Sequence, residues 1–232
     1  TRWNTQMIDF YFHATPNSMK VALLLQELQL PFATHAVDIF KGEQHAPDFR
    51  RINPNGKVPA MVDDGVTIFD SHAILLHLAE KHGRFLETTP QGRAAMLSWL
   101  QLIATGLSPF SGQAIHFLHY APEDLPYAQH RYVTEIERHY AVLDARLAES
   151  RYLADDNNTN DNMALSRWAE SPGYVFGDKG LADYPHVQRL MAELADRPAL
   201  QAALDLKARH AFKSALDDEA RRALFAQPAA AA

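Results

Sequence analysis

The feature that most constrains the fold of this chain is a change in hydrophobic periodicity near residue 90. Before it, strand-like and helix-like segments alternate in the order β-α-β-α-β-β-α. After it, apolar residues recur only at helical spacing. The change predicts an α/β domain over residues 1–86, a polar linker at about 87–93, and an all-helical domain over 94–232.

The predicted elements of the first domain are short and have clear boundary residues. They are a strand over 7–13, a helix from Pro16, a strand over 33–39, a short helix over 46–52, a hairpin around Asp64-Gly65, and a helix over 71–83. Thr15 and Pro16 are typical of an N-cap followed by a first helical residue. In the second domain, helical stripes are expected at Leu97, Leu100, Ile103, Ala104 and Leu107, and at Ile136, Tyr140, Leu143 and Leu147.

The composition excludes several classes of function. The chain has 232 residues, 47% of them hydrophobic, which is enough for a sizeable core. A formal net charge of -6 argues against a general nucleic-acid binder. With no cysteine, the chain can form no disulfide, thiolate metal site or thiol nucleophile of its own. No apolar run is long enough to span a membrane. His116 and His119 are spaced three residues apart, but no third ligand is evident, so a metal site is not expected there.

Two residue pairs stand at the start of secondary-structure elements. Val58-Pro59 precedes a strand, where a cis proline would turn the backbone of Val58 outward to pair with a peptide, or where Pro59 simply starts an edge strand. Asp70-Ser71 precedes a helix, whose N-terminus attracts anions and whose acid can accept from an ammonium group. An ordinary helix cap is the commoner use of such a pair, and both roles can hold together because a ligand adds to the cap.

Four segments carry a resemblance to a known family. They read YFHATPNSMKV, KGEQHAPDFRRINPNGKVPAMVD, FDSHAILLHLAEKHG and GLSPFSGQAIHFLHYAPEDLPYAQHRY. Together they resemble the cytosolic glutathione S-transferase family, and most closely its bacterial Nu class of disulfide-bond-oxidoreductase-like members. The resemblance implies a thioredoxin-like N-terminal domain followed by an all-α domain, glutathione as co-substrate, no metal, a homodimer and a cytoplasmic location.

The resemblance also implies roles for individual residues. The backbone of Val58, bent by Pro59, would pair with glutathione, while Asp70 and Ser71 would hold its γ-glutamyl ammonium and carboxylate. Asp70 is one methylene shorter than the Glu usual in this class. The remaining predicted residues are Gln44 and Lys57 for the glycyl carboxylate, Thr15 and Asn17 as the catalytic pair at the sulfur, and Arg131 for a second thiol ligand. The alternatives are a plain N-cap for Thr15 and solvated surface for Gln44, Lys57 and Arg131.

One segment departs from the family pattern. The helix-opening Ser-x-x-Asp box of the family reads Thr159-x-x-Asn162 here. Threonine can cap a helix, but asparagine carries no charge toward the helix dipole. A less stable helical domain, or a different local shape near 155–175, is therefore expected.

The predicted activity is that of a glutathione-dependent transferase or disulfide reductase. The bound thiolate would attack either a small organic electrophile or a disulfide, with no nucleic-acid or membrane partner. Two alternatives remain open from the sequence. One is a non-catalytic glutathione-binding regulator of the same fold, and the other is a specialised cleavage of aromatic ethers.

Overall fold

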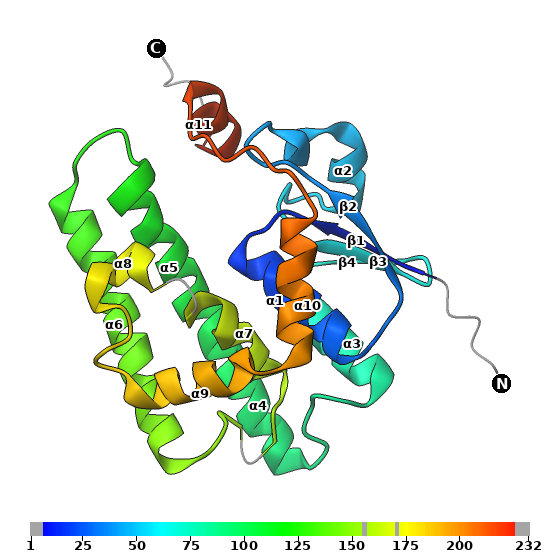
Figure 1. Ribbon diagram of the computed structural model, residues 1–232, viewed down its shortest axis with the longest axis vertical. Helices are drawn as coiled ribbons and strands as arrows, with labels where there is room; N and C mark the ends of the chain where they lie inside the picture. The colour runs from blue at the N-terminus through cyan, green and yellow to red at the C-terminus, as the bar shows by residue number, and fades with distance from the viewer. Residues whose placement is uncertain (1–6, 155–156, 170–171, 226–232) are drawn as a thin grey trace. The chain divides into compact units, whose positions relative to one another are not determined.

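A computed structural model describes residues 7–154, 157–169 and 172–225 of the chain (Figure 1). Its contacts divide it into two compact units. The first unit holds the described residues up to Leu75 together with those from Ala202 onward, and the second holds Leu76–Gln201. The predicted linker at 87–93 remains a prediction, and the predicted outer limits at residues 1 and 232 lie outside the described residues.

A four-stranded mixed sheet forms the centre of the first unit (Figure 1). Its strands are β1 (Ile8–Phe12), β2 (Phe32–Ala36), β3 (Ala60–Asp63) and β4 (Val66–Phe69), in the order β2-β1-β3-β4. β1 and β2 are parallel, and the other neighbours are antiparallel. The predicted hairpin is confirmed, with positive φ at Asp64 (49°) and Gly65 (78°), as its tight turn requires.

The helices of the first unit follow the predicted order. They are α1 (Pro16–Glu27), a 3₁₀ turn (Glu43–His45), α2 (Pro47–Ile52) and the start of α3 (Ser71–His82), joined from the chain's end by the last part of α10 (Pro198–Ala208) and by α11 (Asp218–Phe225). The βαβαββα thioredoxin-like arrangement is therefore confirmed. The second strand ends earlier than predicted, at Ala36, because the Asp38 carboxylate accepts the Phe40 N–H at 3.1 Å and turns the chain.

The side chains of β1 alternate between the two faces of the sheet. Phe10 and Phe12 are fully buried on one face and stack at 5.4 Å between ring centroids. Tyr11 points to the other face, where it packs against Phe49 of α2 in a buried cluster that Val58 also contacts. This period-two pattern follows from strand geometry and gives the sheet a core on each side.

The described residues of the second unit form helices and the loops that connect them. Its elements are the rest of α3, α4 (Pro90–Leu102), a π-helical segment (Ile103–Leu107), α5 (Ser108–Ile115), a second π-helical segment (His116–Tyr120), α6 (Pro126–Glu149), α7 (Asn160–Ala169), α8 (Gly173–Phe176), a 3₁₀ turn (Gly177–Lys179), α9 (Pro185–Ala195) and the start of α10. The all-α prediction is confirmed. No helix within the described residues combines the length and apolar character needed to cross a bilayer.

Two features shape the long helical run before α6. Pro109 has no N–H to donate, and the π-helical segment just before it accommodates that missing bond. Gly106 lies against the ring of His139, where an added Cβ would stand 2.0 Å from Nε2. Only glycine therefore allows this close approach to α6.

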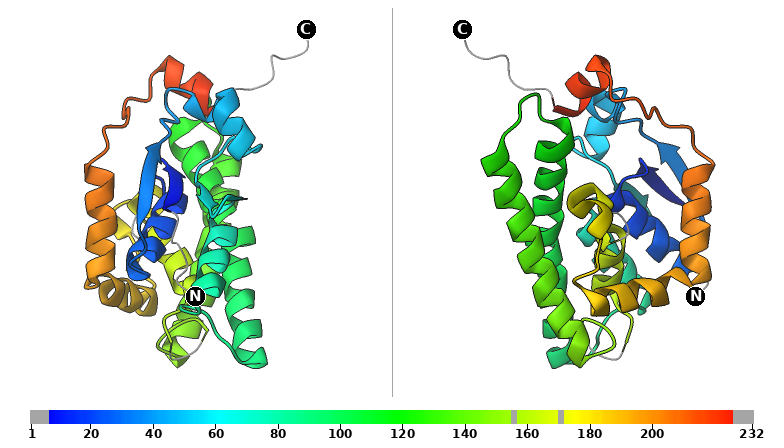
Figure 2. Two further views of the ribbon diagram at one scale, coloured as in Figure 1. Left: turned by 90° about the vertical axis from the view of Figure 1, so that its right-hand side faces the viewer. Right: turned by 60° about the vertical axis from the view of Figure 1, so that its left-hand side comes forward.

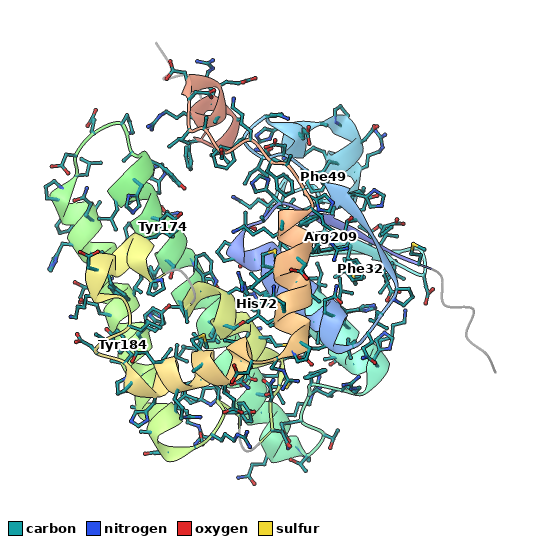
Figure 3. All side chains as sticks on the ribbon, in the orientation of Figure 1. Phe32, Phe49, His72, Tyr174, Tyr184 and Arg209 are labelled. Atoms are coloured by element: carbon teal, nitrogen blue, oxygen red, sulfur yellow. The ribbon has the colours of Figure 1, made fainter. Side chains whose placement is uncertain are left out.

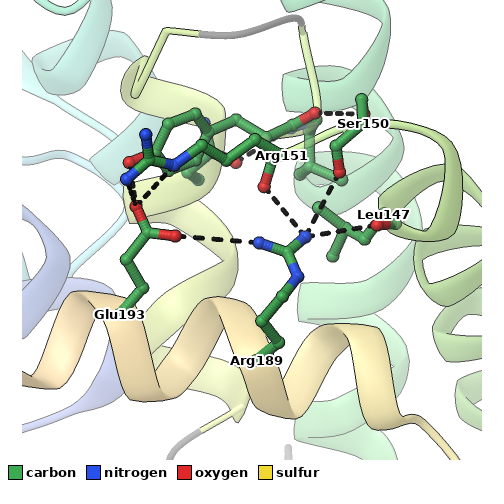
Figure 4. Close-up of polar contacts among 8 residues, drawn as sticks. Leu147, Ser150, Arg151, Arg189 and Glu193 are labelled. Atoms are coloured by element: carbon green, nitrogen blue, oxygen red, sulfur yellow. Dashed lines mark hydrogen bonds and ion pairs between the residues drawn. The ribbon is translucent and has the colours of Figure 1, made fainter.

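Arg189 of α9 caps the end of α6 (Figure 4). Its guanidinium donates to the carbonyls of Leu147, Ser150 and Arg151 at 3.2, 3.2 and 3.0 Å. These are carbonyls at and just past the end of α6, which an arginine can satisfy where no further N–H is available. Glu193 on the next turn of α9 accepts from Arg151 at 2.7 Å, so two helices of this unit are joined by polar contacts.

The altered box at Thr159 still opens α7. The Asn162 side-chain oxygen accepts the Leu153 N–H at 3.0 Å, so the amide fixes the preceding loop without a charge. The charge in the first turn is supplied by Asp161, one position earlier. Asp161 is fully buried and accepts from the Thr159 hydroxyl and from Asn162, while its Oδ2 has no partner among the described residues.

Replacing Asp161 by asparagine is expected to stabilise the protein above about pH 6. Burial is the main cause that raises the pKa of Asp161 from 3.8 to about 6. The folded state therefore holds a proton that the unfolded chain has already lost, so stability falls as pH rises through this window. The charged form then costs up to about 3 kcal/mol of unfolding free energy. The amide oxygen of the introduced asparagine can still accept from Thr159, so thermal denaturation should show a gain of about 1–3 kcal/mol near pH 8 and little near pH 4.

The exposed Asp178 provides a matched control, because its replacement by asparagine removes the same charge from the surface of the same unit. That variant should leave the unfolding free energy within about 0.5 kcal/mol of the original at both pH values. A loss of stability in Asp161→Asn near pH 8 would show instead that the buried charge supports α7 through the helix dipole.

Candidate functional site

The sheet register brings the predicted residues of the first unit to one end of the sheet. Phe12 pairs with Ala36, so the parallel strands β1 and β2 end together. Tyr11 pairs with Ala60, and Ala60 with Phe69, so β3 begins and β4 ends at that same end of the sheet. The segments that leave or enter there carry Thr15, Asn17, Gln44, Lys57, Val58, Pro59, Asp70 and Ser71. Residues from four separate stretches of sequence thus gather around one end of the sheet.

The Val58-Pro59 peptide bond is cis, as the resemblance implied. Neither the N–H nor the C=O of half-buried Val58 takes part in a hydrogen bond among the described residues. The turn before it is held by Asn53, whose side chain donates to the Lys57 carbonyl at 2.6 Å and accepts the Asn55 N–H at 2.9 Å. An extended peptide could therefore pair with Val58 as an added strand.

Thr15 caps α1, as predicted. Its Oγ1 accepts the Ser18 N–H at 3.4 Å and donates to the Ser18 hydroxyl at 3.2 Å. Asn17 follows in the first turn, with its amide oxygen buried and unpartnered among the described residues. A half-turn of that amide exchanges oxygen for N–H₂. The hydroxyl, the amide and the helix N-terminus are three groups that can stabilise an anionic sulfur.

Asp70 adopts a left-handed backbone conformation, with φ of 73°, immediately before α3. Its Oδ1 accepts the N–H groups of His72 at 2.9 Å and Ala73 at 3.3 Å. The His72 imidazole is the main cause of a lowered Asp70 pKa of about 2, and the two N–H groups add to it against the opposing effect of burial. Asp70 is therefore a charged cap, and Ser71 beside it is buried in the first turn.

Gln44 is buried, and both hydrogens of its amide are already used. It donates to the Ile39 carbonyl at 3.2 Å and to the Ala223 carbonyl at 2.9 Å. Its predicted contact with a glycyl carboxylate stays a prediction, and it requires this amide to exchange partners. Lys57 is exposed on the turn before Val58 and has no such constraint.

Sequence reasoning missed the segment that engages Gln44. After α10 the chain follows β2 and the loop beyond it (Figure 2). Phe212 packs on the buried His13 at 4.1 Å between ring centroids, and the Lys213 N–H donates to Asp38 at 2.9 Å. The run of acidic residues at Asp217 is a helix-start signal that predicts α11, but not where α11 docks.

Arg131 belongs to the second unit, on α6. Its guanidinium donates to Glu135 one turn later at 2.5 Å, and its side chain is 53% exposed. Glu135 also accepts from Arg138 at 3.0 Å. Arg131 is thus held on the helix surface by an i,i+4 ion pair, and its predicted ligand contact stays a prediction.

The two histidines of the second π-helical segment have protein partners. His119 contacts the Tyr174 carbonyl at 2.6 Å, and the ring of His116 packs edge-on against Phe117. Across the described residues, no cluster of three or more His, Cys, Asp or Glu side chains is arranged to hold a metal ion.

Comparison with known proteins shows the class of this protein. Residues 14–81 match the family model described as the glutathione S-transferase N-terminal domain. The chain is 43% identical over 220 residues to the disulfide-bond oxidoreductase YfcG of Escherichia coli, covering 92% of this chain and 98% of the relative. The chain therefore belongs to the glutathione S-transferase family, as its motifs predicted.

Among solved structures, the chain is similar to glutathione transferases that were crystallised with glutathione or oxidised glutathione bound. A glutathione transferase from Burkholderia graminis, BgramDRAFT_1843, with two glutathione molecules bound per subunit, superposes with a TM-score of 0.82 at 31% identity, over 88% of this chain and 90% of that one. The transferase URE2P6 of Phanerochaete chrysosporium, in complex with oxidised glutathione, gives the same TM-score and identity over 89% and 98%. Together with the 43% identity to the disulfide-bond oxidoreductase YfcG, these structures confirm the predicted similarity to disulfide-bond-oxidoreductase-like members of the family.

Proposed function

We propose that this protein uses bound glutathione to reduce disulfides by thiol–disulfide exchange. The observation that carries the proposal is the convergence, at one end of the sheet, of the unpaired Val58 backbone with the beginnings of α1 and α3. These three features match the backbone, the thiol and the zwitterionic γ-glutamyl end of an extended tripeptide thiol. The relatives described with two glutathione molecules or with oxidised glutathione support the choice of disulfide chemistry.

In the proposed binding mode, the cysteinyl unit of glutathione pairs with the backbone of Val58. The γ-glutamyl ammonium contacts Asp70, and its carboxylate receives donors from Ser71 and the start of α3. Lys57 provides charge for the glycyl carboxylate. The sulfur then lies near the beginning of α1, where Thr15 and Asn17 donate hydrogen bonds that lower the pKa of the thiol.

The reaction balances without any cysteine from the protein. Bound glutathione thiolate attacks one sulfur of the disulfide, forming a mixed disulfide and releasing the other sulfur as a thiolate that takes up a proton. A second glutathione thiolate then attacks the glutathione sulfur of the mixed disulfide, which yields oxidised glutathione and the second free thiol. Arg131 is proposed to hold a carboxylate of that second molecule. The same first thiolate can displace a leaving group from a small electrophile, which is the transferase reaction.

We also propose that the protein is a cytoplasmic homodimer, as the family resemblance implies. The edge strand β4 supports self-association because Val66 is 54% and Phe69 43% exposed there. Apolar side chains on an open sheet edge are commonly covered by a partner.

Calorimetry followed by a kinetic assay tests the proposed function. The folded protein is titrated with reduced and then oxidised glutathione at millimolar concentration. Reduction of bis(2-hydroxyethyl) disulfide is then followed through glutathione reductase and NADPH, against a blank without the protein. We expect heat of binding and a rate well above the blank. No binding of either form overturns the proposal, and binding without turnover identifies a non-catalytic glutathione-binding protein.

A further inference from the structure

Lys20 is a lysine that none of the proposed binding contacts uses. It lies on α1 with 0% of its surface exposed, and burial is the main cause that lowers its pKa to about 7. Its Nζ lies 3.3 Å from Nε2 of His72, which is also buried and projects from the first turn of α3 beside α1 (Figure 3). A buried amine is costly, so its single polar contact within the described residues points to a purpose at the start of α3.

When Lys20 carries its proton, the chemistry of the two side chains fixes the direction of the hydrogen bond. A lysine ammonium has three donors and no acceptor, so Nε2 of His72 must accept from it. The neutral imidazole then carries its hydrogen on Nδ1. That Nδ1 lies 3.7 Å from Oδ1 of Asp70, longer than a hydrogen bond but close enough for the N–H dipole to attract the carboxylate.

The Asp70 carboxylate has one oxygen held by the protein and one left for a ligand. Every contact that the described residues make with it uses Oδ1: the two N–H groups of α3 and the imidazole of His72. The side chain is 64% exposed, so Oδ2 can be reached from outside the fold. Holding Oδ1 leaves the orientation of Oδ2 defined before a ligand arrives, which reduces the entropy cost of binding.

We infer that Lys20 and His72 are positioning residues for the glutathione site: the ammonium of Lys20 sets the tautomer of His72, and His72 orients the Asp70 carboxylate toward the ligand's ammonium. The inference rests on the proposed function, because it needs glutathione at Asp70. Both residues are buried, so they act through Asp70 and do not touch the ligand. Removing either one should therefore weaken only the part of the affinity that comes from the ligand's amino group.

A pair of ligands that differ in that amino group provides the test. Glutathione and its desamino analogue, glutaryl-cysteinyl-glycine, are titrated by calorimetry into the original protein and into Lys20→Met. We expect the variant to bind glutathione about three- to tenfold more weakly and the analogue within about twofold of the original. With glutathione as substrate, the KM should rise in proportion while kcat stays unchanged.

Substitutions at His72 provide a second, independent set of variants. His72→Asn keeps a donor near the position of Nδ1 and should restore most of the glutathione affinity, whereas His72→Leu should lose it as Lys20→Met does. Met19→Leu, a volume-conserving change at the neighbouring buried position of α1, is the packing control and should alter neither ligand.

The outcomes separate this inference from the proposed function. Equal loss of affinity for both ligands would assign Lys20 and His72 a purely structural role. Unchanged affinity for both ligands would show that Asp70 needs no support from these residues. Either result overturns the inference while the proposed function stands. If the original protein binds neither ligand, the proposed function fails and the inference fails with it. If Lys20→Met does not fold, the two His72 variants decide.

Discussion

Replacing Thr15 by alanine is expected to slow turnover by about ten- to a hundredfold while the protein stays folded. In the folded protein the Thr15 hydroxyl donates to Ser18, and a bound thiolate offers it a charged acceptor in exchange. A hydrogen bond to a charged group contributes about 1.5–3 kcal/mol, which corresponds to a thiol pKa lower by about one to two units. Without the hydroxyl, less of the bound glutathione is thiolate at neutral pH.

The pH dependence of turnover measures this effect. In Thr15→Ala the rise in rate with pH should move to higher pH, and the two proteins should converge where both thiols are fully ionised. Thr15→Ser should behave like the original, because it keeps the hydroxyl, and Thr15→Val should behave like the alanine variant. Loss of the cap costs about 1 kcal/mol of stability in the alanine variant. Unchanged activity in both Thr15→Ala and Thr15→Val would leave Thr15 as a cap only.

The fold could be predicted because its signals are local. The apolar spacing of Val21, Leu24 and Leu25 defines the buried face of α1, and all three are fully buried. Thr15 marks the beginning of that helix through its own hydrogen bonds, and Asp64-Gly65 requires a tight turn. Such signals lie within a few residues of the structure that they specify, so one sequence is enough to detect them.

The candidate site was only partly predictable because its supporting contacts are remote in sequence. Lys20 and His72 are 52 positions apart, and Gln44 meets Ala223 across 179 positions. No periodicity or short motif records such pairings. Lys20 also sits among apolar neighbours on α1, where a lysine is ordinarily expected to reach solvent. The buried position of this lysine becomes evident only when the start of α3 is placed beside it.

Replacing Asp70 by alanine is expected to weaken glutathione binding by more than about tenfold, because a charge-assisted contact of about 1.5–3 kcal/mol is lost. With the pKa of Asp70 lowered to about 2, the carboxylate is ionised at any pH where the protein is assayed. The expected contact is therefore a full ion pair with the ligand's ammonium. Calorimetry with reduced glutathione measures the loss directly.

Two further variants separate the charge of Asp70 from its role as a cap of α3. Asp70→Asn still accepts the N–H groups of His72 and Ala73 but carries no charge, so it should lose affinity nearly as strongly as alanine while keeping the stability of the original. Asp70→Glu restores the charge on a longer side chain and should regain most of the affinity. If Asp70→Asn instead binds glutathione as tightly as the original protein, Asp70 acts only through α3, and the ammonium of the ligand must be bound by another residue.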